Sequence, residues 1–372
     1  MINISGCVGD SEPTLTGVKQ GCPLSPTLFG IFIDALEGWL SHRAPTAGVS
    51  VRTHGGGSRL LPALIYADDL ALLANCPHQL QTLIDALAEF CTAAGLEISA
   101  AKTQVMQFLP APRRTLPPPL PHTFAFGSNT AAPTALDNTE SYKYLGVHFS
   151  NTGNPSDYMP QARRAMAGAY SSMRQRYCGL ACGKHVRLQL QFFSTIVTSA
   201  AMFGGELWGV HPRTAAERGR TAQKHTKFLR QLLRLSPSTS TAALLAELGH
   251  LSMQQRWLQA AVRFWNALVT LPVGDLYRDI LYDSLQEAIA PLPRPKFNQG
   301  FVKGLLAECG RVGYNLTAMQ QLRPASLEVI MELAQQQQQQ REAAVTDICP
   351  RTCPTAGAAD CTYRRWFQRS SV

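Results

Sequence analysis

Two adjacent carboxylates stand between apolar runs in the stretch LLPALIYADDLALLA, residues 60–74. The runs 60–66 and 70–74 have strand length, and the three residues 67–69 between them predict the turn of a hairpin. Burying one ionised Asp without a partner costs several kcal/mol, and two side by side repel each other. A divalent cation offsets both costs, and Mg²⁺ binds through one or two carboxylates together with waters and phosphates. The pair therefore predicts a magnesium site, with a solvated turn as the alternative because Asp is common in turns.

Helices are predicted on both sides of this hairpin. Ser25 is a suitable N-cap and Pro26 a suitable first residue for one helix, and the other opens at Pro77 and stops at Gly95. Their apolar stripes consist of Phe29, Phe32, Ile33, Leu36 and Leu40 in the first and of Leu80, Leu83, Leu87 and Phe90 in the second. Further strands are predicted over 96–99, 105–108 and, as a second hairpin, 142–149. This alternation predicts an α+β domain.

The remainder of the chain has a mainly helical pattern. Helices are predicted over 161–177, 186–202, 221–235 and 242–271. Six prolines and two arginines within 109–121 predict an extended loop. We therefore expect four parts: 1–150 as an α+β domain, 151–271 as a helical domain, 272–340 as a helical extension, and 341–372 as a disordered tail.

Composition and charge narrow the class of protein. The 372 residues suffice for roughly two to three domains, and 45% hydrophobic residues argue against a disordered chain. Residues 155–265 hold 15 Lys or Arg and 4 Asp or Glu, a net of +11, whereas the rest of the chain carries a net of −2. This localised charge favours a polyphosphate partner, because neutralised phosphates release counterions. A set of solvated helix faces is the alternative.

The N-terminus and the cysteines predict an intracellular protein, nuclear or cytoplasmic. No run approaches the ~18 apolar residues of a membrane span, and the N-terminus lacks the pattern of a signal peptide. The ten cysteines lack the spacing of a secreted disulfide scaffold. Two clusters, Cys178/Cys182/His185 and Cys349/Cys353/Cys361, do not supply four ligands at a standard spacing, so we assign no zinc there.

Four motifs in the first 150 residues resemble those of reverse transcriptases and follow that family's order. They are Gly17-Val18-Lys19-Gln20-Gly21-Cys22-Pro23-Leu24-Ser25-Pro26, Tyr66-Ala67-Asp68-Asp69, Gly95-Leu96-Glu97-Ile98 with Lys102-Thr103, and Tyr142-Lys143-Tyr144-Leu145-Gly146-Val147. The first resembles the non-LTR (LINE-like) branch, because group II intron relatives usually carry a second Gly where Cys22 stands. Weaker similarity to a helical thumb and connector continues to about residue 270. The resemblance implies a partial polymerase palm, made of a small antiparallel sheet with helices, followed by that thumb.

The same resemblance implies a role for each matching residue. Asp68 is implied as a ligand of Mg²⁺, with Mn²⁺ as the alternative ion, and Asp69 as its neighbour in the metal site. Lys102 is implied to protonate or neutralise the leaving pyrophosphate, with an ordinary solvated lysine as the alternative. The implied template and nucleotide contacts are Gln20, Gly21, Tyr66 and Ala67; the implied primer grip is Tyr144, Leu145 and Gly146; the implied backbone contacts are Arg163, Arg164, Arg174, Arg176, Lys224, Lys227 and Arg230.

The implied activity is RNA-directed DNA synthesis from an RNA template, a DNA primer and deoxynucleoside triphosphates. The family also carries a third carboxylate on an earlier palm strand, and Asp10, Glu12 and Asp34 do not stand in an apolar strand of that kind. We therefore expect an N-terminally truncated polymerase that is inactive, or nearly so, by itself. One alternative is a remnant that binds nucleic acid without chemistry. Another, supported only by the proline-rich loop and the run 335–340 of glutamines, is an interaction protein.

Overall fold

The computed structural model describes residues 3–4, 7–8, 17–18, 21–108, 123–128, 133–177, 185–289, 300–316 and 322–348. The chain divides into two compact units. The first unit comprises Met1–Val51, Ser58–Val105 and Pro118–Thr139, and the second comprises Arg52–Gly57, Met106–Pro117 and Glu140–Val372. The predicted loop 109–121 and the cysteines at 178, 182, 349, 353 and 361 lie outside the described residues.

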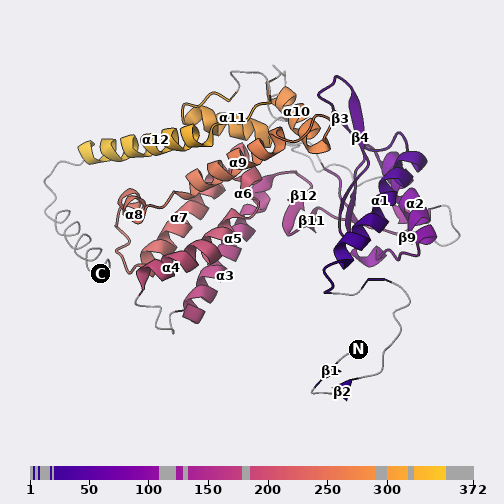
Figure 1. Ribbon diagram of the computed structural model, residues 1–372, viewed down its shortest axis with the longest axis horizontal. Coiled ribbons are helices and arrows are strands. Elements are labelled where there is room, and N and C mark those ends of the chain that lie inside the picture. The colour runs from indigo at the N-terminus through magenta and orange to yellow at the C-terminus, as the bar shows by residue number, and fades with distance from the viewer. Residues whose placement is uncertain are drawn as a thin grey trace. The chain divides into compact units, whose positions relative to one another are not determined.

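Two helices form the core of the first unit and confirm the predicted pair (Figure 1). Helix α1 spans Ser25–Arg43 and α2 spans Pro77–Ala94. Leu36 and Leu40 of α1 pack with Leu83 of α2 in one buried cluster. Gly95 takes a left-handed φ of 67° and closes α2, a backbone conformation that suits glycine because it has no Cβ.

The apolar stripe predicted for α1 is only half correct. Its C-terminal residues are buried, but Phe32 leaves 45% of its surface exposed, and Leu24, Leu28 and Ile31 are exposed as well. The helix also begins one residue earlier than expected: Leu24 is the N-cap and Ser25 is the first helical residue. Periodicity located the helix, whereas the neighbours available within the unit decided how much of its face was covered.

The strands of the first unit pair two by two. The pairs are β1 (Asn3–Ile4) with β2 (Cys7–Val8), β3 (Val49–Arg52) with β4 (Ser58–Leu61), β5 (Ala63–Tyr66) with β6 (Asp69–Leu72), β7 (Gln104–Val105) with β10 (Asp137–Asn138), and β8 (Ala125–Phe126) with β9 (Thr134–Ala135). The β7–β10 pair is parallel, and β1–β2, β5–β6 and β8–β9 are antiparallel. The strand predicted over 96–99 is wrong: that segment has no regular structure and leads into the 3₁₀ turn η1, Ala100–Lys102. Helices with small, mainly antiparallel sheets confirm the α+β class.

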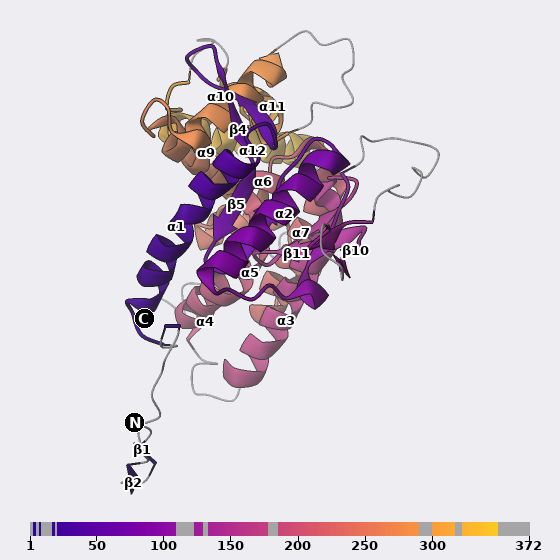
Figure 2. The same ribbon diagram turned by 90° about the vertical axis from the view of Figure 1, so that its right-hand side faces the viewer.

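The second unit is helical after one hairpin, β11 (Ser141–Tyr144) with β12 (Val147–Ser150) (Figure 2). Its helices are α3 (Met159–Tyr177), α4 (Val186–Phe192), α5 (Ser199–Met202), α6 (Gly205–Trp208), α7 (Ala215–Leu232), α8 (Thr241–Leu248), α9 (Met253–Val269), α10 (Leu276–Ile289), α11 (Phe301–Arg311) and α12 (Leu327–Ile348). A π-helical segment, η4 (Phe193–Thr198), joins α4 to α5, and the 3₁₀ turns η2 (Pro155–Asp157) and η5 (Pro212–Thr214) precede α3 and α7.

The single helix predicted over 242–271 is two helices. Gly249, at φ 61°, ends α8 in the left-handed conformation. A capping box then opens α9: the Ser252 hydroxyl accepts from the Gln255 backbone N–H, and the Gln255 side chain accepts from the Ser252 N–H. Leucines on both sides continued the apolar spacing and concealed the break, although glycine followed by a Ser-x-x-Gln pattern signals one.

Two apolar clusters hold these helices. In the first, Tyr170 of α3 stacks on Phe228 of α7 with ring centroids 4.2 Å apart, and Trp257 of α9 is fully buried. In the second, Trp265 of α9 packs with residues of α10, α11 and α12, including the fully buried Leu305. Helix α9 therefore contributes to both clusters and connects the two halves of the unit.

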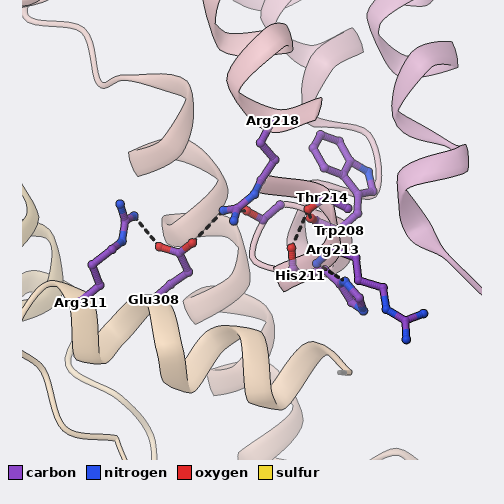
Figure 3. Close-up of polar contacts among 8 residues, drawn as sticks. Trp208, His211, Arg213, Thr214, Arg218, Glu308 and Arg311 are labelled. Atoms are coloured by element: carbon purple, nitrogen blue, oxygen red, sulfur yellow. Dashed lines mark hydrogen bonds and ion pairs between the residues drawn. The ribbon is translucent and has the colours of Figure 1, made fainter. Parts of the chain in front are cut away.

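A charged network joins α6, α7 and α11 (Figure 3). Arg218 Nη1 donates to the Gly209 carbonyl at 2.7 Å and to Glu308 Oε1 at 2.9 Å. Glu308 also pairs with Arg311 on its own helix. The Arg218 and Glu308 side chains are largely buried, so removing Glu308 would leave the buried Arg218 charge without its carboxylate partner, which is strongly destabilising.

Acid is expected to destabilise the second unit through His225. Burial, reinforced by the charges of Arg256 and His250, lowers the pKa of His225 to about 3, and its Nε2 lies 3.0 Å from the Thr198 hydroxyl. Since the unfolded pKa is 6.5, the unfolded chain takes up this proton first. The contribution of neutral His225 to the free energy of unfolding is therefore fully present above pH 6.5 and is lost as the pH falls toward 3. The loss between pH 7.5 and pH 5 is about 2 kcal/mol.

Urea unfolding at those two pH values measures this loss. His225→Gln should remove most of the difference in the free energy of unfolding between the two pH values. A smaller part should remain because burial also lowers the pKa of His250. His185→Gln, at an exposed position, should leave the difference unchanged. An equal pH dependence in wild type and His225→Gln would assign the acid sensitivity to other groups.

Candidate active site

The predicted metal-binding hairpin forms, with one change in register. Strands β5 and β6 pair with Tyr66 opposite Asp69, so the turn consists of Ala67 and Asp68 alone. Asp69 is therefore the first residue of β6 and not a turn residue as expected. Asp68 lies in the turn, whereas Asp69 lies in a paired strand, where successive residues point to opposite faces. The two carboxylates therefore start from different backbone conformations.

Ala67 occupies a sparsely populated conformation at the tip of this hairpin. Its φ is 52°, a region that side chains other than glycine enter at a cost of about 1–3 kcal/mol. A two-residue hairpin turn with positive φ at its first position matches the right-handed twist of the strands. The surrounding pairs thus hold Asp68 in a fixed backbone position, directly after the strained residue.

The carboxylates are exposed, which corrects the expectation of burial between apolar arms. Asp68 and Asp69 are both exposed, and Leu64, Ile65 and Tyr66 on the adjoining strand are exposed too, Tyr66 by 64%. The desolvation argument for a cation therefore does not apply here. The donor set still fits Mg²⁺, because that ion keeps several waters and needs only one or two carboxylates beside phosphate oxygens.

The base of the hairpin is anchored while its tip is open. Ala63, Leu70 and Leu72 pack against the cluster that α1 and α2 share. The Leu73 N–H donates to the Pro62 carbonyl at 2.8 Å and extends the ladder at the base. The two helices therefore set the position of the turn, and the carboxylates remain accessible to a ligand.

Lys102 lies in the exposed turn η1. Ala100 at the start of this turn and Leu72 of β6 both pack on the cluster formed by Ile84, Val105, Phe124 and Leu136. The segment carrying Lys102 and the strand carrying Asp69 thus rest on one set of side chains. Gly21, at φ 84°, lies in the exposed turn before α1, and Gln20 lies outside the described residues.

The predicted primer-grip residues form the turn of β11–β12, in the second unit. Leu145 at φ 48° and Gly146 at φ 81° both have positive φ, as a type I′ turn requires. Asn or Gly is usual at the first position, so Leu145 is strained. Among the described residues three non-glycine residues have positive φ, and two of them, Ala67 and Leu145, stand at the tips of these two hairpins. Neither conformation was anticipated from the sequence.

The seven basic residues predicted to contact a nucleic-acid backbone fall into three groups. Arg163 pairs with Glu217, and its hydrogen bond holds the pKa of that carboxyl below its usual range. Arg230 donates to the Thr239 carbonyl and the Thr241 hydroxyl, so both arginines are engaged in the fold. The others remain at the surface: Arg174 and Lys224 lie over the rings of Tyr170 and Phe228, and Arg164, Arg176 and Lys227 are exposed.

The described part of the chain has neither a preformed cluster of metal ligands nor a membrane-spanning helix. No group of three or more His, Cys, Asp or Glu side chains there could hold a metal ion; Asp10 and Glu12 lie outside that part. Among the helices the structure describes, none combines the length and the apolar character of a membrane span.

The similarity to known proteins lies in the segment that contains these hairpins. Residues 2–149 match the family described as reverse transcriptase (RNA-dependent DNA polymerase). A Pol polyprotein from a type-2 retrotransposable element of Drosophila melanogaster is 33% identical over 168 residues, which are 44% of this chain and 15% of the relative. A transposon-derived protein of Caenorhabditis elegans is 31% identical over 150 residues, 40% of this chain and 50% of the relative.

A Pol polyprotein from the type-1 retrotransposable element R2 of Nasonia vitripennis is 30% identical over 138 residues, 37% of this chain and 12% of the relative. The chain thus spans at most half the length of these relatives. The matched residues 2–149 contain the exposed carboxylate turn and end within the β11–β12 hairpin. Residues 2–149 therefore form a reverse transcriptase segment of the non-LTR retrotransposon type.

Proposed function

We propose that this chain carries the palm and thumb of an RNA-directed DNA polymerase. Residues 1–150 serve as the palm, 151–271 as the helical thumb and connector, and 272–340 as a helical extension. The observation that carries the proposal is the accessible pair Asp68 and Asp69 at the tip of β5–β6, held by a base that is packed on α1 and α2. The substrates are an RNA template, a DNA primer and deoxynucleoside triphosphates.

In this reaction the primer's 3′ hydroxyl attacks the α-phosphate of the nucleotide in line with the leaving pyrophosphate. Asp68 and Asp69 would hold Mg²⁺, which in two-metal sites stabilises the attacking and leaving oxygens. Asp68 would be the principal ligand of that ion, and the ammonium of Lys102 neutralises charge on the pyrophosphate as it leaves. The alternative is a remnant that binds nucleic acid through its basic helices without chemistry.

The exposed basic residues of α3 and α7 bind the phosphate backbone in this proposal. Arg164→Ala and Lys227→Ala should each weaken duplex binding at 0.1 M salt and reduce the slope of log affinity against log salt by about 1. Arg163→Ala should instead act mainly on stability, because that side chain pairs with Glu217. Fluorescence anisotropy over a salt series measures the slopes. Unchanged slopes in both surface variants would remove α3 and α7 from the duplex-binding surface.

We also propose that this chain alone extends primers weakly or not at all. One hairpin supplies two carboxylates, and preorganised charge around the triphosphate provides much of the rate enhancement in phosphoryl transfer. Purified protein with Mg²⁺ and a primed RNA template tests this directly. Robust extension that Asp68→Ala abolishes would overturn the proposed inactivity and establish the polymerase. Absence of extension together with duplex binding that ignores both Mg²⁺ and Asp68→Ala would favour the non-catalytic remnant.

A further inference from the structure

An exposed aromatic ring lies against the turn of the β11–β12 hairpin. In Figures 1 and 2 this hairpin lies beside α5 and α6, and Phe203 is the residue that follows α5. A Cβ built on Gly146 would lie 3.3 Å from Phe203 Cζ and 3.5 Å from its Cε1. The ring edge therefore approaches the Gly146 backbone more closely than another side chain there would comfortably allow.

The backbone of Phe203 is fixed although its ring is half exposed. The indole Nε1 of Trp208 donates to the Phe203 carbonyl at 2.8 Å, and Trp208 is buried against Trp257 with ring centroids 5.2 Å apart. Gly204, at φ 65°, turns the chain into α6 directly afterwards. Phe203 itself leaves 50% of its surface accessible. A fixed backbone with an exposed ring is typical of a residue that stacks on a ligand rather than of a core residue.

The charges nearby select a base or a sugar over a phosphate. Glu206 follows three residues later; burial, and after it the charge of Glu206, raises the pKa of Tyr158. A phosphate placed beside this carboxylate would be repelled, whereas the uncharged face of a nucleobase would not. Exposed Lys143, on β11 of the same hairpin, offers a cation for the backbone on the strand side.

We propose that Phe203, seated against Gly146, stacks on the terminal nucleotide of the primer. This inference rests on the proposed function, because it uses the assignment of β11–β12 to the primer's 3′ end. It adds a positioning residue outside the segment 2–149 that matches the family. Aromatic rings contribute to single-strand and end binding through the π-face that every base presents, so the contact carries little sequence preference.

The test uses a DNA primer with 2-aminopurine at its 3′ end, annealed to a longer RNA template, because stacking quenches this base. Wild-type protein should quench the terminal probe on binding. Phe203→Ala should lose that quench and bind the recessed duplex about 5-fold or more weakly. Phe203→Trp should keep the quench, and Phe203→Leu, which keeps apolar packing without a ring, should lose it. Thermal unfolding of each variant verifies that the fold is retained.

Two controls separate this inference from the function beneath it. Phe149→Ala removes another exposed ring, 41% accessible, from the end of β12 away from the turn, and should quench like wild type. A probe placed six base pairs inside the duplex should respond equally to all variants. Full quenching by Phe203→Ala would contradict the proposed stacking of Phe203 on the primer terminus and would leave the polymerase proposal intact. Failure of the wild-type protein to bind the recessed duplex would overturn the proposed function itself.

Discussion

Asp68→Asn is expected to weaken divalent-cation binding in the presence of primer, template and nucleotide by at least about 100-fold. Loss of an outer hydrogen-bond partner of a metal ligand typically costs 10–100-fold, and removing the charge of a direct ligand should cost no less. Asp69→Asn should have a smaller effect, because Asp69 pairs with Tyr66 in the ladder while Asp68 stands in the turn. Mn²⁺ titration followed by electron paramagnetic resonance measures both affinities.

The matched control for this pair is Asp34→Asn. Asp34 lies exposed on α1, in the same unit, so its replacement removes an equal charge without touching the hairpin. It should leave Mn²⁺ affinity within about 2-fold of wild type, since interactions between exposed charges are strongly screened. Equal losses in Asp34→Asn and Asp68→Asn would mean that the ion responds to net charge and not to a site at the turn.

Gly209→Ala should be the most damaging small substitution in the second unit. A Cβ at this position would lie 2.2 Å from the Gly205 carbonyl oxygen and 2.6 Å from Trp257 Cβ. Neither the backbone nor a fully buried indole can move away cheaply, so the cost should reach the upper end of overpacking, about 3 kcal/mol or more. The displacement would also disturb the hydrogen bond that Arg218 donates to Gly209.

Gly219→Ala provides the opposite expectation in the neighbouring helix α7. Nothing lies within 4 Å of a Cβ there, and alanine in a helix interior is more stable than glycine by about 0.5–1 kcal/mol. Urea unfolding of the full chain should therefore shift to lower midpoint for Gly209→Ala and to higher midpoint for Gly219→Ala. Similar shifts in the two variants would show that α6 is not packed on α9 as closely as described.

Local signals located the elements of the first unit well. Pro26, Pro77 and Gly95 mark helix ends through backbone chemistry that depends on one or two residues, and α1 and α2 lie where they predict. The two hairpins follow from apolar runs on either side of short turns. The carboxylate turn itself was therefore predictable, whereas its one-residue shift at Asp69 depends on pairing across the strands.

Features set by distant contacts were not predictable in the same way. Phe32 has the spacing of a buried residue but is exposed. Arg163 has the charge of a phosphate ligand but pairs with Glu217, 54 positions away. Glu217 is one of four acidic residues in the basic segment 155–265, and that rarity was a usable signal. The contact between Phe203 and Gly146 left no local pattern at all.

The position of the bound ion tests the central claim most directly. Fe²⁺ bound in place of Mg²⁺ and activated with ascorbate and peroxide cuts the polypeptide beside the metal, and mass spectrometry locates the cut. We predict cleavage within the β5–β6 hairpin, residues 63–72, suppressed by excess Mg²⁺ and absent from Asp68→Asn. Cleavage confined to other segments, with this hairpin intact in the wild-type chain, would contradict the account.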